Sequence, residues 1–126
     1  DAKIPVVKLG DSGEVFYELA LDMLTVIEEK NARNERAVLI CPVGPVGQYP
    51  IFTRLVNERR VSLKNTWFLN MDEYLDESGA WIDPTHRLSF RGFMQREVYA
   101  RIDPALVMPE INGFFPIRQS HPRCLP

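Results

Sequence analysis

An uninterrupted apolar run from Ala37 to Cys41 constrains the fold of this chain more than any other feature. A strand-forming run without alternating polar positions is typical of a strand that is covered on both faces. It ends in a loop rich in proline and glycine, residues 42–50, and residues 51–60 then carry apolar side chains at helical spacing. The order of strand, glycine-bearing loop and helix is a βα unit, so we predict an α/β fold.

A second apolar run, Thr66 to Leu69, leads directly into the adjacent carboxylates of Asp72 and Glu73. A strand–helix–strand segment of this length predicts a right-handed parallel crossover. The strand ends at 41–44 and 70–74 therefore lie on one edge of the sheet, the edge where open α/β sheets bind ligands. Carboxylates at that edge cost solvation free energy unless they are hydrated, paired or used in catalysis.

Two further helices are predicted around this pair of strands. The first begins at a capping Asp11 and runs to about Asn31. The other begins near 83–85, and we expect Gly92 within it to pack closely against a neighbour. Residues 105–126 are predicted to form an irregular tail in which only 113–117 could be a short strand. The predicted buried stripes are Phe16, Leu19, Ala20, Met23, Leu24 and Ile27 in the first helix, and Phe90, Phe93, Met94, Val98 and Ile102 in the other.

Composition and charge narrow the function. With 126 residues, a net charge of −2 and a pI near 5.7, the chain is one domain or part of one, and we expect no nucleic-acid or membrane partner. No apolar run of about 18–20 residues or signal peptide is present, which favours the cytoplasm. The spacing of Cys41, His86, His121 and Cys124 supports neither a metal site nor a disulfide framework.

The glycines of the 42–50 loop fit neither the dinucleotide-binding nor the P-loop pattern. By spacing alone, a tight turn without a ligand explains this loop as well as a phosphate-binding turn does.

Three segments together resemble the glucosamine-6-phosphate isomerase/deaminase family, which is related to 6-phosphogluconolactonases. They are Pro42-Val43-Gly44, Asn70-Met71-Asp72-Glu73-Tyr74 and His86-Arg87-Leu88-Ser89-Phe90-Arg91-Gly92-Phe93-Met94. The second segment resembles the sugar-isomerising branch, since the lactonase branch usually has Asp-Glu-Arg there. The similarity keeps its order over most of residues 11–105.

The resemblance implies a Rossmann-like, doubly wound parallel sheet and an aldose–ketose isomerisation that releases ammonia through an enediol, without a cofactor. Asp72 would be the general base, in a partly buried site within reach of a carbon-bound proton. Glu73 would be a structural or polarising acid, and Tyr74 a packing residue with a polar tip. His86 and Ser89 would lie on a substrate loop, although helix capping and surface polarity explain them equally well.

The resemblance also implies that a sugar phosphate binds at the turn from Pro42 to Gly47. This turn departs from the family, which usually has Thr-Gly-Gly/Ser-Thr-Pro. Val43 brings no hydroxyl and Pro45 no N–H, so phosphate would meet the amides of Gly44, Val46 and Gly47, and we expect weaker or altered substrate binding.

The second departure is length, because family members are roughly twice as long and carry an Asp-Gly-His segment for ring opening in their second half. We therefore expect residues 1–126 to be a single, partial domain equivalent to the N-terminal half, either as a truncated or frame-shifted product or as one part of a larger assembly. Half of such a sheet would expose apolar surface, which predicts a homo-oligomer. A non-catalytic, effector-type sugar-phosphate-binding module or an inactive fragment stays an alternative.

Overall fold

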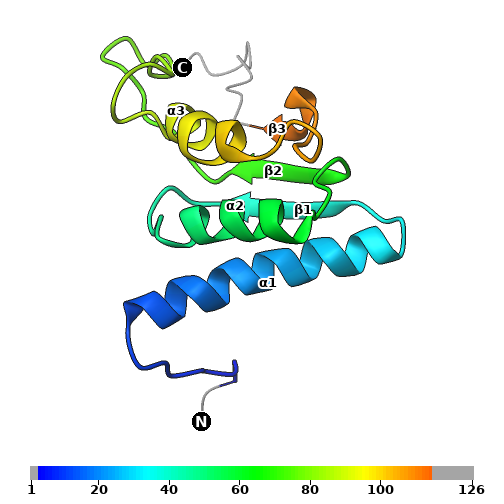
Figure 1. Ribbon diagram of the computed structural model, residues 1–126. Coiled ribbons are helices and arrows are strands. Elements are labelled where there is room, and N and C mark those ends of the chain that lie inside the picture. Colours follow the sequence, from blue (N-terminus) through cyan, green and yellow to red (C-terminus); the bar gives the residue numbers. More distant parts are fainter. Residues whose placement is uncertain (1–2, 115–126) are drawn as a thin grey trace.

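The computed structural model describes residues 3–114, in which three parallel strands form one sheet (Figure 1). The strands are β1 (Ala37–Cys41), β2 (Thr66–Asn70) and β3 (Gly113–Phe114), in the spatial order β1-β2-β3. Residues 37–41 pair in register with residues 66–70, so the predicted strands and their parallel crossover are confirmed. The predicted strand at 113–117 is confirmed for its first two residues, and the rest lies outside the described residues.

Helix α1 (Ser12–Ala32) begins where the sequence predicts it. The Asp11 carboxylate accepts a 2.9 Å hydrogen bond from the Glu14 amide, and this satisfies one of the free N–H groups of the first turn. Of the predicted stripe, Ala20, Leu24 and Ile27 are fully buried, whereas Leu19 is 37% exposed. Leu19 was therefore wrongly assigned to the core, because it lies on a flank of α1 that no described element covers.

Helix α2 (Gln48–Arg59) connects β1 to β2 and supplies the centre of the core. It starts three residues before the first position predicted from apolar spacing. Phe52 is fully buried and meets the ring of Phe68 on β2 edge-on, with 6.3 Å between the ring centroids. An aromatic pair of this kind stabilises a core beyond its buried area, by roughly 0.5–1.5 kcal/mol.

The predicted helix start at 83–85 is wrong. Residues 83–89 form turns, in which the Asp83 carboxylate accepts from the Thr85 amide, and α3 (Phe90–Phe93) begins after Ser89. The helical path continues through η1 (Met94–Val98) and η2 (Tyr99–Arg101), and a short η3 (Glu110–Asn112) precedes β3. The expected stripe is confirmed, with Met94, Val98 and Ile102 buried and the two phenylalanines half-buried. Close packing at Gly92 is also confirmed, because a Cβ there would lie 1.9 Å from the Pro84 carbonyl oxygen.

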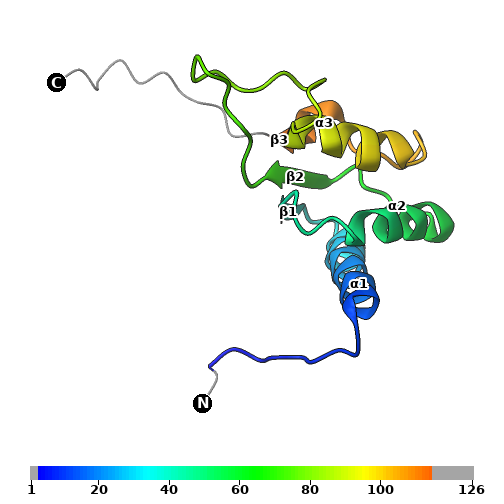
Figure 2. The ribbon, with the colours of Figure 1, turned by 90° about the vertical axis from the view of Figure 1, so that its left-hand side faces the viewer.

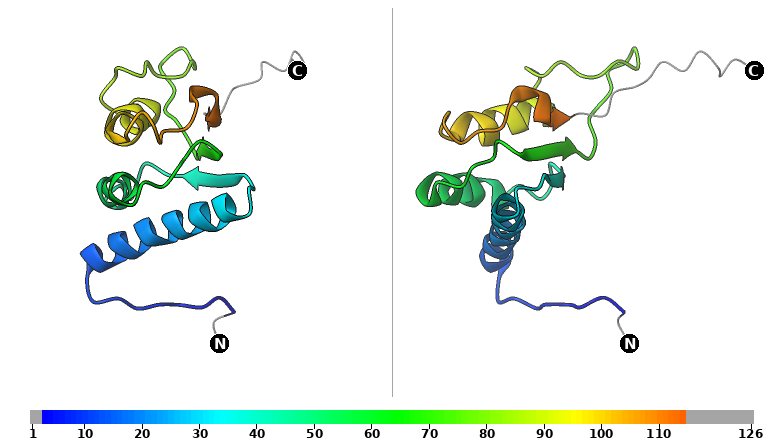
Figure 3. Two further views of the ribbon diagram at one scale, coloured as in Figure 1. Left: turned by 45° about the vertical axis from the view of Figure 1, so that its right-hand side comes forward. Right: turned by 90° about the vertical axis from the view of Figure 1, so that its right-hand side faces the viewer.

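The two faces of the sheet differ. Figures 2 and 3 show α1, α2 and α3 on one side of the strands. Successive strands added in one direction by right-handed crossovers keep their connecting helices on one face. The prediction that β1 is covered on both faces is therefore wrong for the described residues, since Val38 and Ile40 are 53% and 69% exposed.

Candidate active site

Two loops leave the carboxyl edge of the sheet side by side. Cys41 and Asn70 are register partners at the ends of their strands, and the Met71 amide donates a 3.1 Å hydrogen bond to the Cys41 carbonyl. The predicted convergence of the two strand ends is therefore confirmed. Residues 42–47 are called the Gly44 loop below, and residues 71–89 are called the Asp72 loop.

The Gly44 loop is held by side chains from the first turn of α2. The Tyr49 hydroxyl donates to the Pro42 carbonyl at 2.5 Å, and the Gln48 side-chain amide donates to the Pro45 carbonyl at 2.9 Å. Both donors are almost fully buried, so the loop rests on the core through two side-chain-to-backbone hydrogen bonds. These bonds use carbonyl groups of the loop and leave its amides free.

The free amides of the Gly44 loop lie just before α2 and at its N-cap. Within the described residues, the backbone N–H groups of Gly44, Val46 and Gly47 donate no hydrogen bond. The N-cap residue Gly47 supplies no side-chain cap, and the first turn of α2 has no acidic residue. Because unsatisfied N–H groups at a helix N-terminus favour a negative charge, this end of α2 suits an anion such as phosphate.

Two residues in this loop have a clear local reason. Gly44 has a φ of +154°, and a Cβ there would meet nothing within 4 Å, so its backbone conformation rather than space favours glycine. The Val43 side chain is half-buried and packs against the hydrophobic core. The position where the family usually has a small polar group is thus part of the packing in this chain.

Asp72 lies where the second loop begins. Its side chain is exposed, and within residues 3–114 its carboxylate takes part in no hydrogen bond or ion pair. The expectation of a partly buried site is therefore not met by the described residues alone. An exposed carboxylate without a partner is free to accept a proton from a ligand at this edge.

Glu73, the next residue, has the opposite environment. Its carboxylate accepts hydrogen bonds from the Ser89 hydroxyl at 2.8 Å, from the amides of Phe90 and Arg91 at 2.9 Å each, and from its own chain neighbour Tyr74 at 3.0 Å. Three of the four donors come from the start of α3, 16 to 18 residues further along the chain. Glu73 thus closes the Asp72 loop.

The protonation of Glu73 follows from these contacts. Partial burial by itself raises the pKa of the Glu73 carboxyl, but the hydrogen bonds from Arg91, Phe90, Tyr74 and Ser89 outweigh it and lower the pKa. The donors favour the charged form because a carboxylate accepts their N–H and O–H bonds. Glu73 therefore stays ionised near neutral pH and has no proton to donate.

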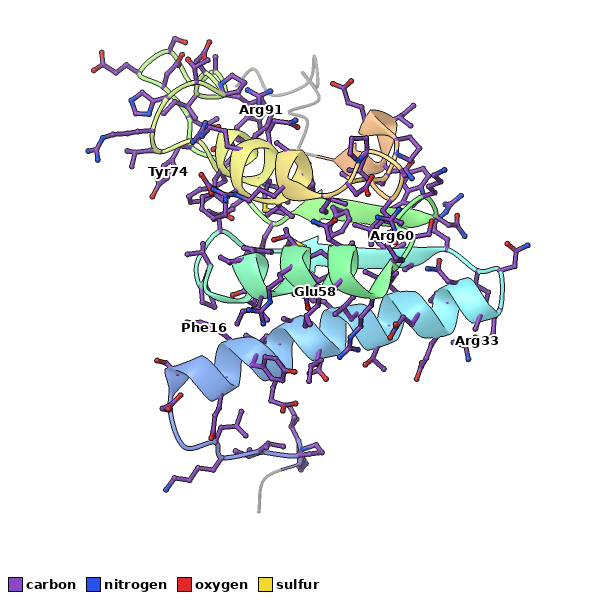
Figure 4. The ribbon with its side chains drawn as sticks, in the orientation of Figure 1. Phe16, Arg33, Glu58, Arg60, Tyr74 and Arg91 are labelled. Atoms are coloured by element: carbon purple, nitrogen blue, oxygen red, sulfur yellow. The ribbon has the colours of Figure 1, made fainter. Side chains whose placement is uncertain are left out.

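The other predicted site residues lie along the same loop. Tyr74, which is labelled in Figure 4, is 48% exposed, and its ring centroid lies 4.9 Å from that of Phe90. Ser89 is buried and accepts from the Gly92 amide at 3.0 Å, so its helix-capping role is confirmed. His86 is exposed, and its Nδ1 accepts a bond from the Leu88 amide; no described contact joins it to Asp72.

The sequence patterns did not single out two buried polar residues at this edge, Gln48 and Asn70. Gln48 Oε1 and both side-chain polar atoms of Asn70 are buried without a hydrogen-bond partner in the described part of the chain. Such groups cost about 1–3 kcal/mol each when left unpaired. The only available signal was position, since Asn70 occupies the buried side of β2 that Phe68 also faces.

The described residues give little support to a metal site, a reactive thiol or a membrane-spanning helix. No group of three His, Cys, Asp or Glu side chains there could hold a metal ion, and His121 and Cys124 lie outside that range. Cys41 is a buried free thiol whose pKa is raised to about 11 by burial, which makes it a poor nucleophile. None of the helices in residues 3–114 is long and apolar enough to cross a membrane.

Comparison with known proteins shows what this arrangement resembles. No protein-family model matches the chain. A glucosamine-6-phosphate deaminase of Malacoplasma penetrans is 27% identical over 114 residues, which are 90% of this chain and 43% of the relative. One of Borrelia garinii subsp. bavariensis is 30% identical over 73 residues, which are 56% of this chain and 25% of the relative. A solved structure, a monomeric glucosamine-6-phosphate deaminase described as a missing link of the NagB superfamily, aligns with a TM-score of 0.74 at 23% identity, over 90% of this chain and 42% of its own.

The fold and the carboxyl edge of its sheet define a partial α/β domain, with parallel strands and polar loops at that edge. The resemblance to the glucosamine-6-phosphate isomerase/deaminase family, which the motifs indicated, is confirmed over the part of the fold that this chain spans. That part is less than half the length of the relatives it matches.

Proposed function

We propose that this edge binds a phosphorylated amino sugar and that Asp72 is the general base of an aldose–ketose isomerisation that releases ammonia. The observation that carries the proposal is the pairing of a carboxylate that has no partner within residues 3–114 with a loop whose amides donate no hydrogen bond there. Asp72 and the Gly44 loop leave neighbouring strand ends joined by the bond from Met71 to Cys41. An anionic sugar could thus be fixed by its phosphate while the carboxylate meets its carbon-bound hydrogen.

The proposed chemistry assigns one proton transfer to Asp72. The carboxylate removes the proton from C2 of the opened sugar while the C1 carbonyl oxygen takes up a proton from solvent, so that an enediol-type intermediate forms. The carboxylic acid, whose proton can exchange with solvent, then donates a proton back to C2, or it donates a proton to C1 while the amine nitrogen loses one. The bond between C2 and the amine nitrogen is then an imine, and water adds to it and releases ammonia. Glu73 takes no part in this transfer, because its oxygens are occupied by donors from α3.

Phosphate binding is assigned to the amides of Gly44, Val46 and Gly47 at the N-terminus of α2. Val43 offers no hydroxyl and Pro45 no N–H, so fewer hydrogen bonds reach the phosphate than a loop with threonines would supply. Each missing hydrogen bond to a charged group weakens binding by about 1.5–3 kcal/mol. We therefore propose a weaker affinity for the phosphate than a threonine-bearing loop would give.

A second candidate is a binding module that holds a sugar phosphate without turnover. It is favoured by the exposure of Asp72, because the described residues supply the amides of the Gly44 loop but do not enclose the Asp72 carboxylate. Such a module would bind the opened or closed sugar but would not release ammonia.

Calorimetry and an ammonia assay separate the two candidates. Glucosamine 6-phosphate is titrated into the chain, and ammonia is measured over the same concentration range. Binding with ammonia release supports the isomerase, binding alone supports the module, and no heat of binding contradicts both. Inorganic phosphate and glucosamine without phosphate serve as matched ligands that report the two ends of the substrate separately.

Two further predictions concern the oligomeric state of the chain and its location. The exposed apolar side chains of β1 give self-association a physical basis, and sedimentation velocity measures the oligomeric state. A cytoplasmic location stays a prediction from the sequence.

A further inference from the structure

The geometry assigns to Glu73 the role of a positioning residue, which holds the backbone of Asp72 at the sheet edge by tying the start of its loop to α3. The assignment rests on the proposed function of Asp72. It gives Glu73 a task at the site that needs neither a proton transfer nor contact with the substrate.

The backbone on both sides of Asp72 is fixed while its side chain is not. On one side, the Met71 amide donates to the Cys41 carbonyl at 3.1 Å. On the other, the Glu73 carboxylate accepts from Ser89, Phe90 and Arg91 at 2.8–2.9 Å. Asp72 is exposed whereas Glu73 is half-buried, so the two acids face different surroundings. One carboxylate is used to hold the backbone, and the other stays available.

The remaining contacts of the Asp72 loop also leave Glu73 as the acid that holds the backbone beside Asp72. The Tyr74 ring meets the Phe90 ring beside the Glu73 contacts, and the Ile82 amide donates to the Tyr74 carbonyl at 3.0 Å. The Asp76 and Asp83 carboxylates bond to amides and hydroxyls of their own turns. Within the described residues, Glu73 is the acid of this loop whose hydrogen bonds bridge to α3. Its removal would leave the ring contact, local turns, and the bonds from Arg91 to the Ile82 carbonyl at 3.1 Å and from Arg96 to the Pro84 carbonyl at 3.2 Å, which hold the far end of the loop and not the segment beside Asp72.

The fit of Glu73 depends on its length and on both of its oxygens. Oε1 accepts from Phe90 and Tyr74, and Oε2 accepts from Ser89 and Arg91. Glutamine at this position would direct an NH2 group at N–H donors, and aspartate would keep the charge but be one methylene shorter. A role by charge alone is therefore preserved in Glu73→Asp, whereas a role by position is lost in both variants.

The test compares Glu73→Gln and Glu73→Asp with Glu77→Gln, a matched change of an exposed acid that forms no described hydrogen bond. Exchange of the sugar C2 hydrogen with deuterated water is measured with glucosamine 6-phosphate. We expect kcat for exchange to fall by about tenfold to a hundredfold in both Glu73 variants, with KM changed by less than about threefold and Glu77→Gln unchanged. Activity of wild-type level in Glu73→Asp, or equal losses in Glu77→Gln, would overturn the assignment.

A second measurement is independent of turnover. The backbone amide signal of Asp72 in an NMR spectrum of the wild-type chain is expected to be single and sharp, and in Glu73→Gln to be broadened by motion on the microsecond-to-millisecond scale. If the wild type shows no C2 exchange but the Asp72 signal broadens in Glu73→Gln, the proposed function fails and the backbone tie stands. An unchanged Asp72 signal together with faster hydrogen exchange at the Phe90 and Arg91 amides would show a tie that does not position Asp72.

Discussion

The Gly44 loop and the Asp72 loop leave the same sheet edge, but they are held in opposite ways. In the first, side chains of the following helix donate hydrogen bonds to loop carbonyls, from Tyr49 to Pro42 and from Gln48 to Pro45. In the second, a side chain of the loop accepts hydrogen bonds from the following helix, from Phe90 and Arg91 to Glu73. Each arrangement leaves one kind of group unused, amides in the first loop and the Asp72 carboxylate in the second.

This difference shows how one edge can offer both polarities to a ligand. Free N–H groups beside a helix N-terminus favour an anion, and a free carboxylate favours a proton or a hydroxyl donor. The two loops begin at register partners, Cys41 and Asn70, so the two kinds of group share one side of the sheet. The following changes test each loop separately, beginning with the largest expected effect.

Gly92→Ala is expected to lower the free energy of unfolding by about 3 kcal/mol, the upper end of the usual cost of overpacking, because it disturbs the contact between α3 and the Asp72 loop. The new Cβ would lie 1.9 Å from the carbonyl oxygen of Pro84, which is backbone and must move. Gly47→Ala is the matched control in the Gly44 loop, where the Cβ would meet the Phe16 ring at 2.3 Å (Figure 4 labels Phe16). A side chain can turn away, so we expect a smaller loss in urea denaturation; the reverse order would contradict this contrast.

Tyr49→Phe removes the donor that holds the Gly44 loop at Pro42. Because the partly buried carbonyl loses its partner, we expect the free energy of unfolding to fall by about 1–2 kcal/mol. Tyr17→Phe on the exposed side of α1 is the control, and its stability should stay within about 0.5 kcal/mol of wild type. Equal midpoints for wild type and Tyr49→Phe in urea would show that the loop does not depend on this bond.

The lowered pKa of Glu73 gives the Asp72 loop a pH dependence in the acid range. The folded-state pKa of Glu73 is lowered, so its contribution to stability is complete above the unfolded pKa of about 4.3 and is lost as the pH falls through the folded value. Several other acids with lowered pKa also destabilise the chain in acid, among them Asp76, Asp83 and Asp103. The difference in unfolding free energy between wild type and Glu73→Gln isolates the Glu73 part, and it should shrink below about pH 4. A pH-independent difference would mean that Glu73 is not held by these hydrogen bonds.

Local patterns predicted much of the fold. Each of three features lies within one short stretch of the sequence: the apolar run at 37–41, the run at 66–69 and the cap at Asp11. Their residue types were therefore sufficient to predict β1, β2 and the start of α1. The exposed face of β1 could not be predicted in this way. An apolar run indicates that a strand suits burial, but what covers it depends on where the following crossovers place their helices.

The sequence predicted that Asp72 and Glu73 follow the end of a strand, but it did not predict their contacts. Asp72 and Glu73 are adjacent acids, and residue type alone does not distinguish their roles. Glu73 becomes a structural acceptor only because the chain returns to it at residues 89–91. The capping role of Ser89 placed the start of α3 later than the Asp83-Pro84 signal indicated. Gln48 and Asn70 became noticeable only once their burial without a partner was known.

The most direct test of the account is the exchange of hydrogen at C2 of glucosamine 6-phosphate in deuterated water. Asp72→Asn removes the proposed base, and because the exposed Asp72 carboxylate has no described partner, the unfolding free energy should stay within about 0.5 kcal/mol of wild type. We predict that the wild-type chain incorporates deuterium at C2 and that Asp72→Asn does so at least about a hundredfold more slowly, as expected for the loss of a general base. Equal incorporation by the two proteins would contradict the role of Asp72, and none by either would contradict the proposed activity of this chain.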